Sequence, residues 1–180
     1  AAREDVEGDF PRRGFDSQNL HRNKRSLTLD LKSPRGIDIL KRLIAKADVV
    51  VENFRPDVKT RLGIDYETLS TLNPRLIYAS ITGFGESGPN ASRAGSDIVA
   101  QAYTGLMNAE AKTDEFGAPA QITGTTIIDR ASGMAAAMAI CAALYHRERT
   151  GEGQEIRVSL VQTGLELVSH QVMREPVHDV

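Results

Sequence analysis

Asp129 is the residue whose type and position most directly suggest chemistry in this 180-residue chain. It follows the apolar pair Ile127 and Ile128, at the start of a long run of small and apolar residues typical of a helix. A carboxylate there can accept hydrogen bonds from the free N–H groups of the first turn, which is the more common role. It can also point into a cleft and act as a nucleophile or proton carrier. Both roles stay open at this point.

Basic side chains near the ends of two expected strands form a second candidate site. They are Arg22, Lys24 and Arg25 before the first strand, Lys32 after it, and Arg55 and Arg61 after the second. Arg and Lys give charge-assisted hydrogen bonds to phosphate, so an anionic ligand is one interpretation. A solvated edge is the other, and the two cations after the second strand favour the ligand.

The glycine-rich stretch 83–88, GFGESG, has the spacing of a dinucleotide-binding loop but not its context. Pro89 and Asn90 follow it, where that motif requires a helix. It fits better as a flexible loop that covers a substrate. The four histidines have no metal-ligand spacing with cysteines or carboxylates, and Ser132 lies in no G-x-S-x-G elbow. We therefore expect neither a metal site nor a serine hydrolase.

The composition is that of an ordinary globular domain, with 41% hydrophobic and 26% charged residues. A net charge of -2 gives no general attraction to nucleic acid or anionic membranes, so neither is an expected partner. No apolar run approaches the length of a membrane span and no signal peptide opens the chain, which favours a cytoplasmic protein. The single cysteine, Cys141, is expected to be a small buried core residue.

The elements that must position these residues follow the order of a parallel α/β sheet. Alternating leucines predict a strand over 26–31, Ser33 and Pro34 open a helix, and an apolar run predicts a buried strand over 48–52. Such a strand–helix–strand unit is the signature of a parallel sheet. The other expected elements are helices over 56–62 and 66–72, a strand over 75–82, a helix over 96–107, a loop over 108–123, the long helix from Asp129, a strand over 155–160 and a helix over 161–174.

Taken in order, several segments resemble the class III CoA-transferases, the CaiB/BaiF-type family that includes formyl-CoA transferase-like enzymes. The segments are HRNKRSLTLDLK, ADVVVENFRPDVKTRLGIDYETLSTLNPRLIYASITGFGESGP, RAGSDIVAQAYTGLM, the helix of Asp129 and RTGEGQEIRVSL. The resemblance implies an α/β fold with a Rossmann-like parallel sheet flanked by helices, part of the large domain of an interlocked homodimer. We expect residues 1–25 to be an N-terminal loop or extension and 26–180 to be the core of that domain, a fragment without the family's small domain.

The resemblance also implies a function. Family members move CoA from an acyl-CoA to a carboxylic acid, with the CoA thioester as substrate and no permanently bound cofactor or metal. Asp129 matches the catalytic aspartate, which forms a covalent aspartyl intermediate. The residues that match the family's CoA-binding positions are Leu29, Asp30, Leu31, Lys32, Asn53, Phe54, Arg55, Arg61, Ala94, Gly95, Ser96 and Asp97. The cations among them would suit the CoA phosphates, and Phe54 could pack on the adenine.

Two alternatives stay open. The α-methylacyl-CoA racemases of the same family have a His where this chain has Ser96, in the segment 94–97. A hydroxyl is no base near neutral pH, so Asp129 would supply only half of a two-base scheme. The second alternative is a truncated chain that folds, or binds a partner, without turnover.

Overall fold

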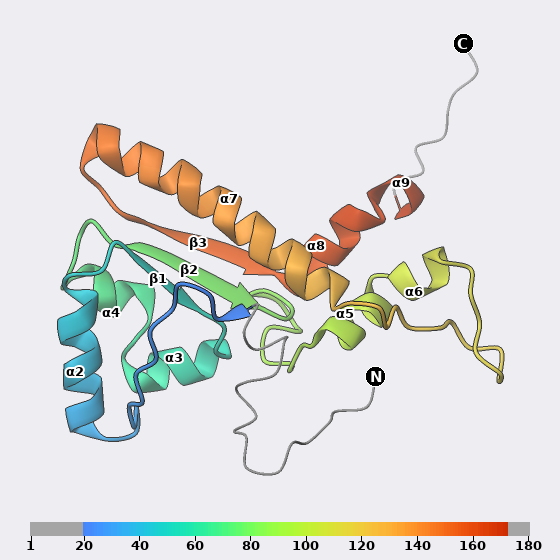
Figure 1. Cartoon of the computed structure of the whole chain (residues 1–180), viewed down its shortest axis with the longest axis horizontal. Helices are drawn as coiled ribbons and strands as arrows, with labels where there is room; N and C mark the ends of the chain where they lie inside the picture. Colours follow the sequence, from blue (N-terminus) through green and yellow to red (C-terminus); the bar gives the residue numbers. More distant parts are fainter. Residues whose placement is uncertain (1–19, 173–180) are drawn as a thin grey trace. The chain divides into compact units, whose positions relative to one another are not determined.

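The computed structural model describes residues 20–172 and divides the chain into two units, Ala1–Asp30 and Leu31–Val180. The second unit contains a parallel three-stranded sheet in the order β1–β2–β3 (Figure 1). Its strands are β1 (Val49–Glu52), β2 (Ile77–Thr82) and β3 (Gln154–Ser159). Its helices are α2 (Pro34–Ile44), α3 (Pro56–Leu62), α4 (Tyr66–Ser70), α5 (Asp97–Tyr103), α6 (Leu106–Ala109), α7 (Ile127–Thr150), α8 (Leu160–Leu167) and α9 (Ser169–Val172).

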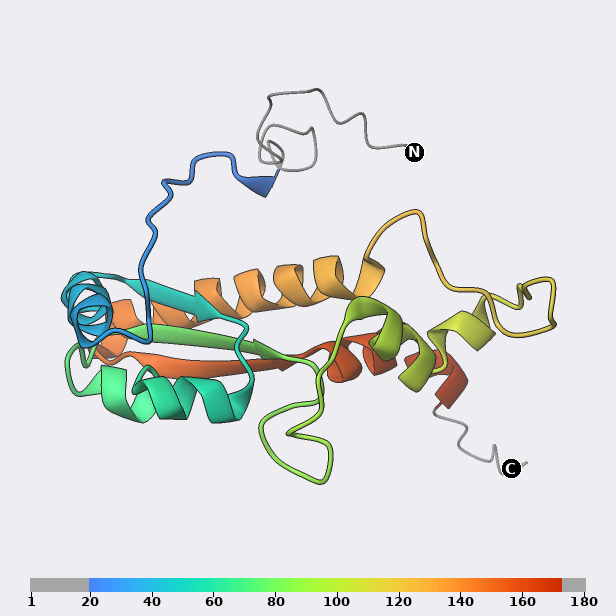
Figure 2. The same ribbon diagram turned by 90° about the horizontal axis from the view of Figure 1, so that it is seen from below.

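Helices cover both faces of this sheet, because successive strand residues point to opposite sides and both sides are apolar. On one face, Ala143 of α7 packs with Ile77 and Ala79 of β2. On the other face, residues of α2 and α4 pack with Leu76 and Tyr78. Figures 1 and 2 show α7 along one face of the sheet and α3 and α4 along the other. The predicted parallel sheet flanked by helices is confirmed.

The register of strand pairing aligns the carboxyl ends of the three parallel strands. Glu52, the last residue of β1, lies opposite Ser80 of β2, and Thr82, the last residue of β2, lies opposite Ser159 of β3. The segments that follow β1 and β2 therefore leave the sheet at the same edge. Ligands bind at this edge in open α/β sheets.

The strand predicted over 26–31 is wrong. Residues 26–30 have no regular secondary structure and Leu27 is exposed, while residues 31 and 32 lie in a turn. A strand is stable only when its N–H and C=O groups pair with a neighbour, and within residues 20–172 β1 pairs with β2 alone. Alternating leucines show that a segment is suited to a sheet, but they do not supply the partner strand.

Two predicted helices are each divided. Gly105, in the left-handed region with φ of 80°, separates α5 from α6, so the helix predicted over 96–107 is interrupted. The helix predicted over 161–174 begins one residue earlier, at Leu160, and breaks at Val168 between α8 and α9. Residues 173 and 174 lie outside the described part of the chain. Both breaks let short helices pack around the start of α7, where Ala100, Leu106, Ile128, Leu160 and Val168 form a buried cluster.

The outward face of α7 corrects two further predictions. Cys141 is exposed rather than buried, because helical spacing places it in one stripe with Met134, Met138 and Tyr145, all of which are more than half exposed. By length and composition, α7 is also apolar enough to cross a membrane, contrary to the expectation that no segment is. The core helix of a globular domain can pass the same test, and α7 packs along β2 and β3.

Candidate functional site

A small pocket of about 110 Å³ opens where β1 and β2 end. The residues after β1 form one wall, and the end of β2 with the loop that follows forms the other. The lining residues are Asn53, Phe54, Arg55 and Pro56 on the first wall, and Thr82, Gly83, Ala91, Arg93, Ala94 and Gly95 on the second. Five predicted site residues are thus brought together here, namely Asn53, Phe54, Arg55, Ala94 and Gly95.

Two glycines set the path of the second wall. A Cβ atom on Gly83 would lie 2.6 Å from the Cα atom of Gly95, and a Cβ atom on Gly95 would collide with the backbone of Gly83. The backbones can cross at this distance only because neither residue has a side chain. The crossing returns the glycine-rich loop to the start of α5 and places Ala94 and Gly95 beside the end of β2.

Arg93 is a pocket residue that the sequence analysis does not identify. Its guanidinium lies 5.3 Å from the centre of the Phe84 ring, and this ring meets Tyr103 of α5 edge-on at 5.1 Å. Nη1 of Arg93 donates to Asn90 Oδ1 at 3.4 Å, and stacking on the ring leaves the other N–H groups of the guanidinium available. The pocket is therefore lined by two cations, Arg55 and Arg93. The only signal in the sequence was the position of Arg93 one residue before the motif 94–97.

Asp97 begins α5 and caps a different helix. Its buried carboxylate accepts hydrogen bonds through Oδ1 from the backbone N–H groups of Ile128 at 2.8 Å and Asp129 at 3.1 Å. These are two of the free N–H groups of the first turn of α7. Thr126, at the N-cap position of α7, gives no side-chain cap. Asp97 therefore fills, from another element, the capping role that the sequence left open for Asp129.

Gln101 holds Asp97 in this position. Its side chain is fully buried one turn further along α5 and donates from Nε2 to Oδ2 of Asp97. The same amide accepts from the backbone N–H of Ile122 at 2.9 Å and donates to the carbonyl of Ile122 at 3.3 Å. The loop before α7, α5 and the first turn of α7 are thus connected through one buried polar chain.

Asp129 itself is left available. Its side chain is exposed, and within residues 20–172 no hydrogen bond or ion pair engages its carboxylate. Partial desolvation, and then the negative charge of Asp97, raise the pKa of Asp129 above its ordinary value of 3.8. Of the two roles open for Asp129, the structure disfavours capping.

The other predicted site residues lie outside the pocket lining. Arg61 is exposed on α3, with its guanidinium 3.8 Å from the Asp57 carboxylate. Ser96 is exposed at the N-cap position of α5 and makes no side-chain cap. Leu31 and Lys32 precede α2, and Leu29 and Asp30 belong to the first unit. CoA-binding roles for these residues remain predictions.

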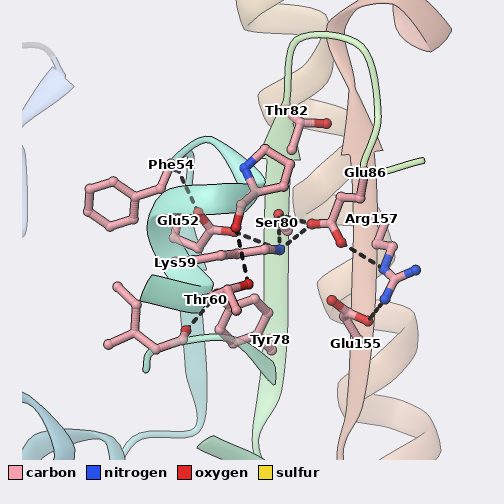
Figure 3. Close-up of polar contacts among 12 residues, drawn as sticks. Glu52, Phe54, Lys59, Thr60, Tyr78, Ser80, Thr82, Glu86, Glu155 and Arg157 are labelled. Atoms are coloured by element: carbon pink, nitrogen blue, oxygen red, sulfur yellow. Dashed lines mark hydrogen bonds and ion pairs between the residues drawn. The ribbon is translucent and has the colours of Figure 1, made fainter. Parts of the chain in front are cut away.

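A buried group of charged side chains lies beside the pocket, and the sequence analysis misses it (Figure 3). The Lys59 ammonium donates to Ser80 Oγ at 3.1 Å, lies 3.5 Å from Glu52 Oε1 and pairs with Glu86 Oε1. Arg157 of β3 contacts the other oxygen of Glu86 at 3.2 Å. Burial disfavours the charged form of Glu86, but hydrogen bonds from Lys59 and Ser80 and the two nearby cations outweigh it and lower its pKa. The signal in the sequence was Glu52, a charge ending a buried strand that needs a cationic partner.

Comparisons with known proteins identify the family of this chain. The sequence model described as CoA-transferase family III matches residues 6–179. The succinate–glutarate CoA-transferase of Agrobacterium fabrum is 43% identical over 153 residues, which are 85% of this chain and 38% of that protein. The formyl-CoA:oxalate CoA-transferase of Streptomyces coelicolor is 43% identical over 148 residues, 82% of this chain and 35% of that protein.

Some solved structures are similar to this chain in both sequence and fold. Rv3272 from M. tuberculosis is 38% identical with a TM-score of 0.78, over 85% of this chain and 42% of that one. A CAIB/BAIF family protein from Brucella suis is 41% identical with a TM-score of 0.75, over 83% of this chain and 39% of that one. The chain thus spans about two fifths of the length of the relatives it matches.

Proposed function

Because this chain belongs to CoA-transferase family III, we propose that the protein transfers CoA from an acyl-CoA to a carboxylic acid and that Asp129 is the nucleophile. The observation that carries the proposal is the position of the Asp129 carboxylate. It lies at the start of α7 without a hydrogen bond or ion pair to any part of the chain that the structure describes, while Asp97 accepts from two of the free N–H groups of that helix. The relatives named above are CoA-transferases of small carboxylic acids, which supports an acyl-CoA and a free acid as the substrate classes.

The proposed reaction has two halves. The Asp129 carboxylate attacks the thioester carbonyl, the C–S bond breaks, and the CoA thiolate leaves behind a mixed anhydride. The thiolate then attacks the aspartyl carbonyl of the anhydride, which releases the donor acid and forms an aspartyl-CoA thioester. The acceptor carboxylate reverses these steps and regenerates Asp129. Covalent catalysis divides one difficult exchange into easier steps, without net proton transfer.

The pocket suits part of a CoA molecule. Arg55 and Arg93 can give charge-assisted hydrogen bonds to phosphate oxygens, and Phe54, which is 38% exposed, can pack on the adenine. Ala94 and Gly95 lead directly to Asp97, which is hydrogen bonded to the first turn of α7. A CoA bound along this wall would direct its thioester toward Asp129. The interlocked homodimer and the cytoplasmic location stay predictions.

Replacing Arg55 with alanine is expected to raise the KM for acyl-CoA about tenfold, because a tenfold loss of affinity matches the binding free energy of one hydrogen bond to a charged group. The KM for the acceptor acid should change little. Arg61→Ala should have a smaller effect, because both arginines contact the Asp57 carboxylate but only Arg55 lines the pocket. Steady-state kinetics with each substrate varied in turn measure both constants. Arg149→Ala, near the end of α7 remote from this edge of the sheet, is the matched control. An unchanged KM for acyl-CoA in Arg55→Ala would show that Arg55 does not contribute to acyl-CoA binding.

The reaction class is tested by following CoA and the α-proton in one experiment. Incubating the intact protein with a 2-methylacyl-CoA and a labelled carboxylic acid in deuterated water should move CoA to the labelled acid. No deuterium should enter the α-position, because Ser96 supplies no base opposite Asp129. Rapid deuterium uptake without CoA exchange would identify an isomerase instead. If neither reaction occurs with any of a series of acyl-CoA donors, the result would indicate a chain that folds or binds a partner without turnover.

A further inference from the structure

The ammonium of Lys59 lies between the carboxylates of Glu52, at the end of β1, and Glu86, in the loop after β2 (Figure 3). Lys59 is only 4% exposed, and its contacts come from three different elements. Glu52 ends β1, Ser80 belongs to β2, and Glu86 lies in the middle of the glycine-rich loop. The ring of Tyr78 lies beneath it, with its centre 5.5 Å from the ammonium. The buried ammonium therefore connects β1, β2 and the glycine-rich loop through its three polar partners.

Each carboxylate that Lys59 contacts also holds a pocket wall. The second oxygen of Glu52 accepts a hydrogen bond from the backbone N–H of Phe54 at 2.7 Å, which fixes the turn that leads into the first wall. Glu86 accepts a hydrogen bond from Ser80 at 2.7 Å and pairs with Arg157 on β3. Residues 87–89, beyond this anchor, are exposed. The middle of the loop is thus tied to the sheet, where the sequence predicted a flexible loop.

The charge balance shows what Lys59 contributes. Glu52 and Glu86 both contact a single ammonium, so without Lys59 two carboxylates with little exposed surface would face each other. Two like charges that share one partner repel each other more strongly where little water screens them. Arg157 would remain beside Glu86, but it is more than half exposed and lies on the far side of that carboxylate. The expected response is movement of the glycine-rich loop away from β1, which separates the two walls.

We propose that Lys59 is a positioning residue for CoA binding, which holds the turn after β1 and the glycine-rich loop at the spacing that the ligand requires. The proposal rests on the proposed function, because it takes CoA as the occupant of the pocket. Lys59 does not itself line the pocket. Its removal should therefore weaken the binding of CoA while leaving the chemistry at Asp129 largely intact.

The test compares Lys59→Met, Glu86→Gln and the double variant in the intact protein. Calorimetric titration with CoA should show Lys59→Met binding about tenfold more weakly, with kcat at saturating acyl-CoA within about twofold of wild type. Glu86→Gln should have a smaller effect, because the amide keeps an acceptor for Ser80. The double variant should bind CoA more tightly than Lys59→Met, because only one of the two facing carboxylates remains. Amide hydrogen exchange of residues 53–56 and 83–95 should be faster in Lys59→Met and partly restored in the double variant.

Two controls separate positioning from general stability. Lys112→Met removes an exposed lysine from the loop before α7 and should change neither readout. Ile44→Val removes a methylene from the buried cluster around Leu69 and should lower Tm without changing CoA affinity. CoA binding by Lys59→Met equal to that of wild type, or no improvement in the double variant, would overturn the proposal. If the wild-type protein itself does not bind CoA, the proposed function fails, and hydrogen exchange in the two walls decides the role of Lys59 alone.

Discussion

Replacing Asp129 with asparagine is expected to lower kcat for CoA transfer by about 10³-fold or more, as loss of a covalent nucleophile does in other enzymes. The amide nitrogen does not attack a thioester under these conditions, so no anhydride forms. The fold should be kept, because Asp97 and not Asp129 caps α7, and the exposed Asp129 carboxylate has no hydrogen bond or ion pair within residues 20–172 that asparagine would break. The exchange of labelled CoA between an acyl-CoA and a free acid gives the rate, and thermal unfolding checks the fold.

A chemical trap distinguishes loss of the nucleophile from loss of substrate binding. Wild-type protein incubated with acyl-CoA and hydroxylamine should form an aspartyl hydroxamate at residue 129, detected by peptide mass spectrometry. Asp129→Asn should form none. Asp114→Asn is the matched control, since Asp114 is an exposed turn residue that accepts two backbone hydrogen bonds and asparagine can accept the same ones. Full turnover in Asp129→Asn, or a hydroxamate elsewhere in the wild-type protein, would contradict the assignment of the nucleophile.

Replacing Asp97 with alanine is expected to have the next largest effect, a loss of about 10- to 100-fold in kcat and about 1–2 kcal/mol in unfolding free energy. The N–H groups of Ile128 and Asp129 would lose their acceptor, and the first turn of α7 would no longer be held against α5. A nucleophile displaced by a fraction of its attack distance loses much of its rate. Chemical denaturation measures the stability change, and single-turnover kinetics measure the chemical step.

The asparagine variant at the same position separates the cap from the charge. Asp97→Asn keeps an oxygen for the two N–H groups, although it gives up the oxygen that accepts from Gln101, and it removes the negative charge that helps raise the pKa of Asp129. Asp129 attacks as the anion, so the rate rises with pH through the pKa of this group. The acid limb of the pH–rate profile should therefore move to lower pH in Asp97→Asn, although only in part, because desolvation is the larger cause of the shift. A profile that moves to higher pH would show that Asp97 does not act on Asp129 through its charge.

The local elements and one part of the site follow from the sequence alone. Helix α3 has the bounds predicted from Pro56 and Gly63, because proline suits the first turn of a helix and glycine adopts the left-handed conformation that ends it. The three strands of the sheet lie within two residues of the strands predicted over 48–52, 75–82 and 155–160. Asn53, Phe54 and Arg55 follow one of these predicted strands and line the pocket with Gly83, because parallel strands end at one edge of the sheet.

The tertiary structure alone decided how the charged groups are used. The spacing of residues along the sequence does not predict that Asp97 caps a helix that begins thirty residues later. It also does not predict that Lys59 contacts both Glu52 and Glu86. Periodicity reports which residues of one element share a face, whereas these contacts depend on how separate elements pack against each other. The same limit explains the exposed Cys141, because a stripe of small residues does not reveal which side of α7 faces the sheet. Desolvation and charge pairing act between residues that folding brings together, so the availability of Asp129 could be determined only from the folded chain.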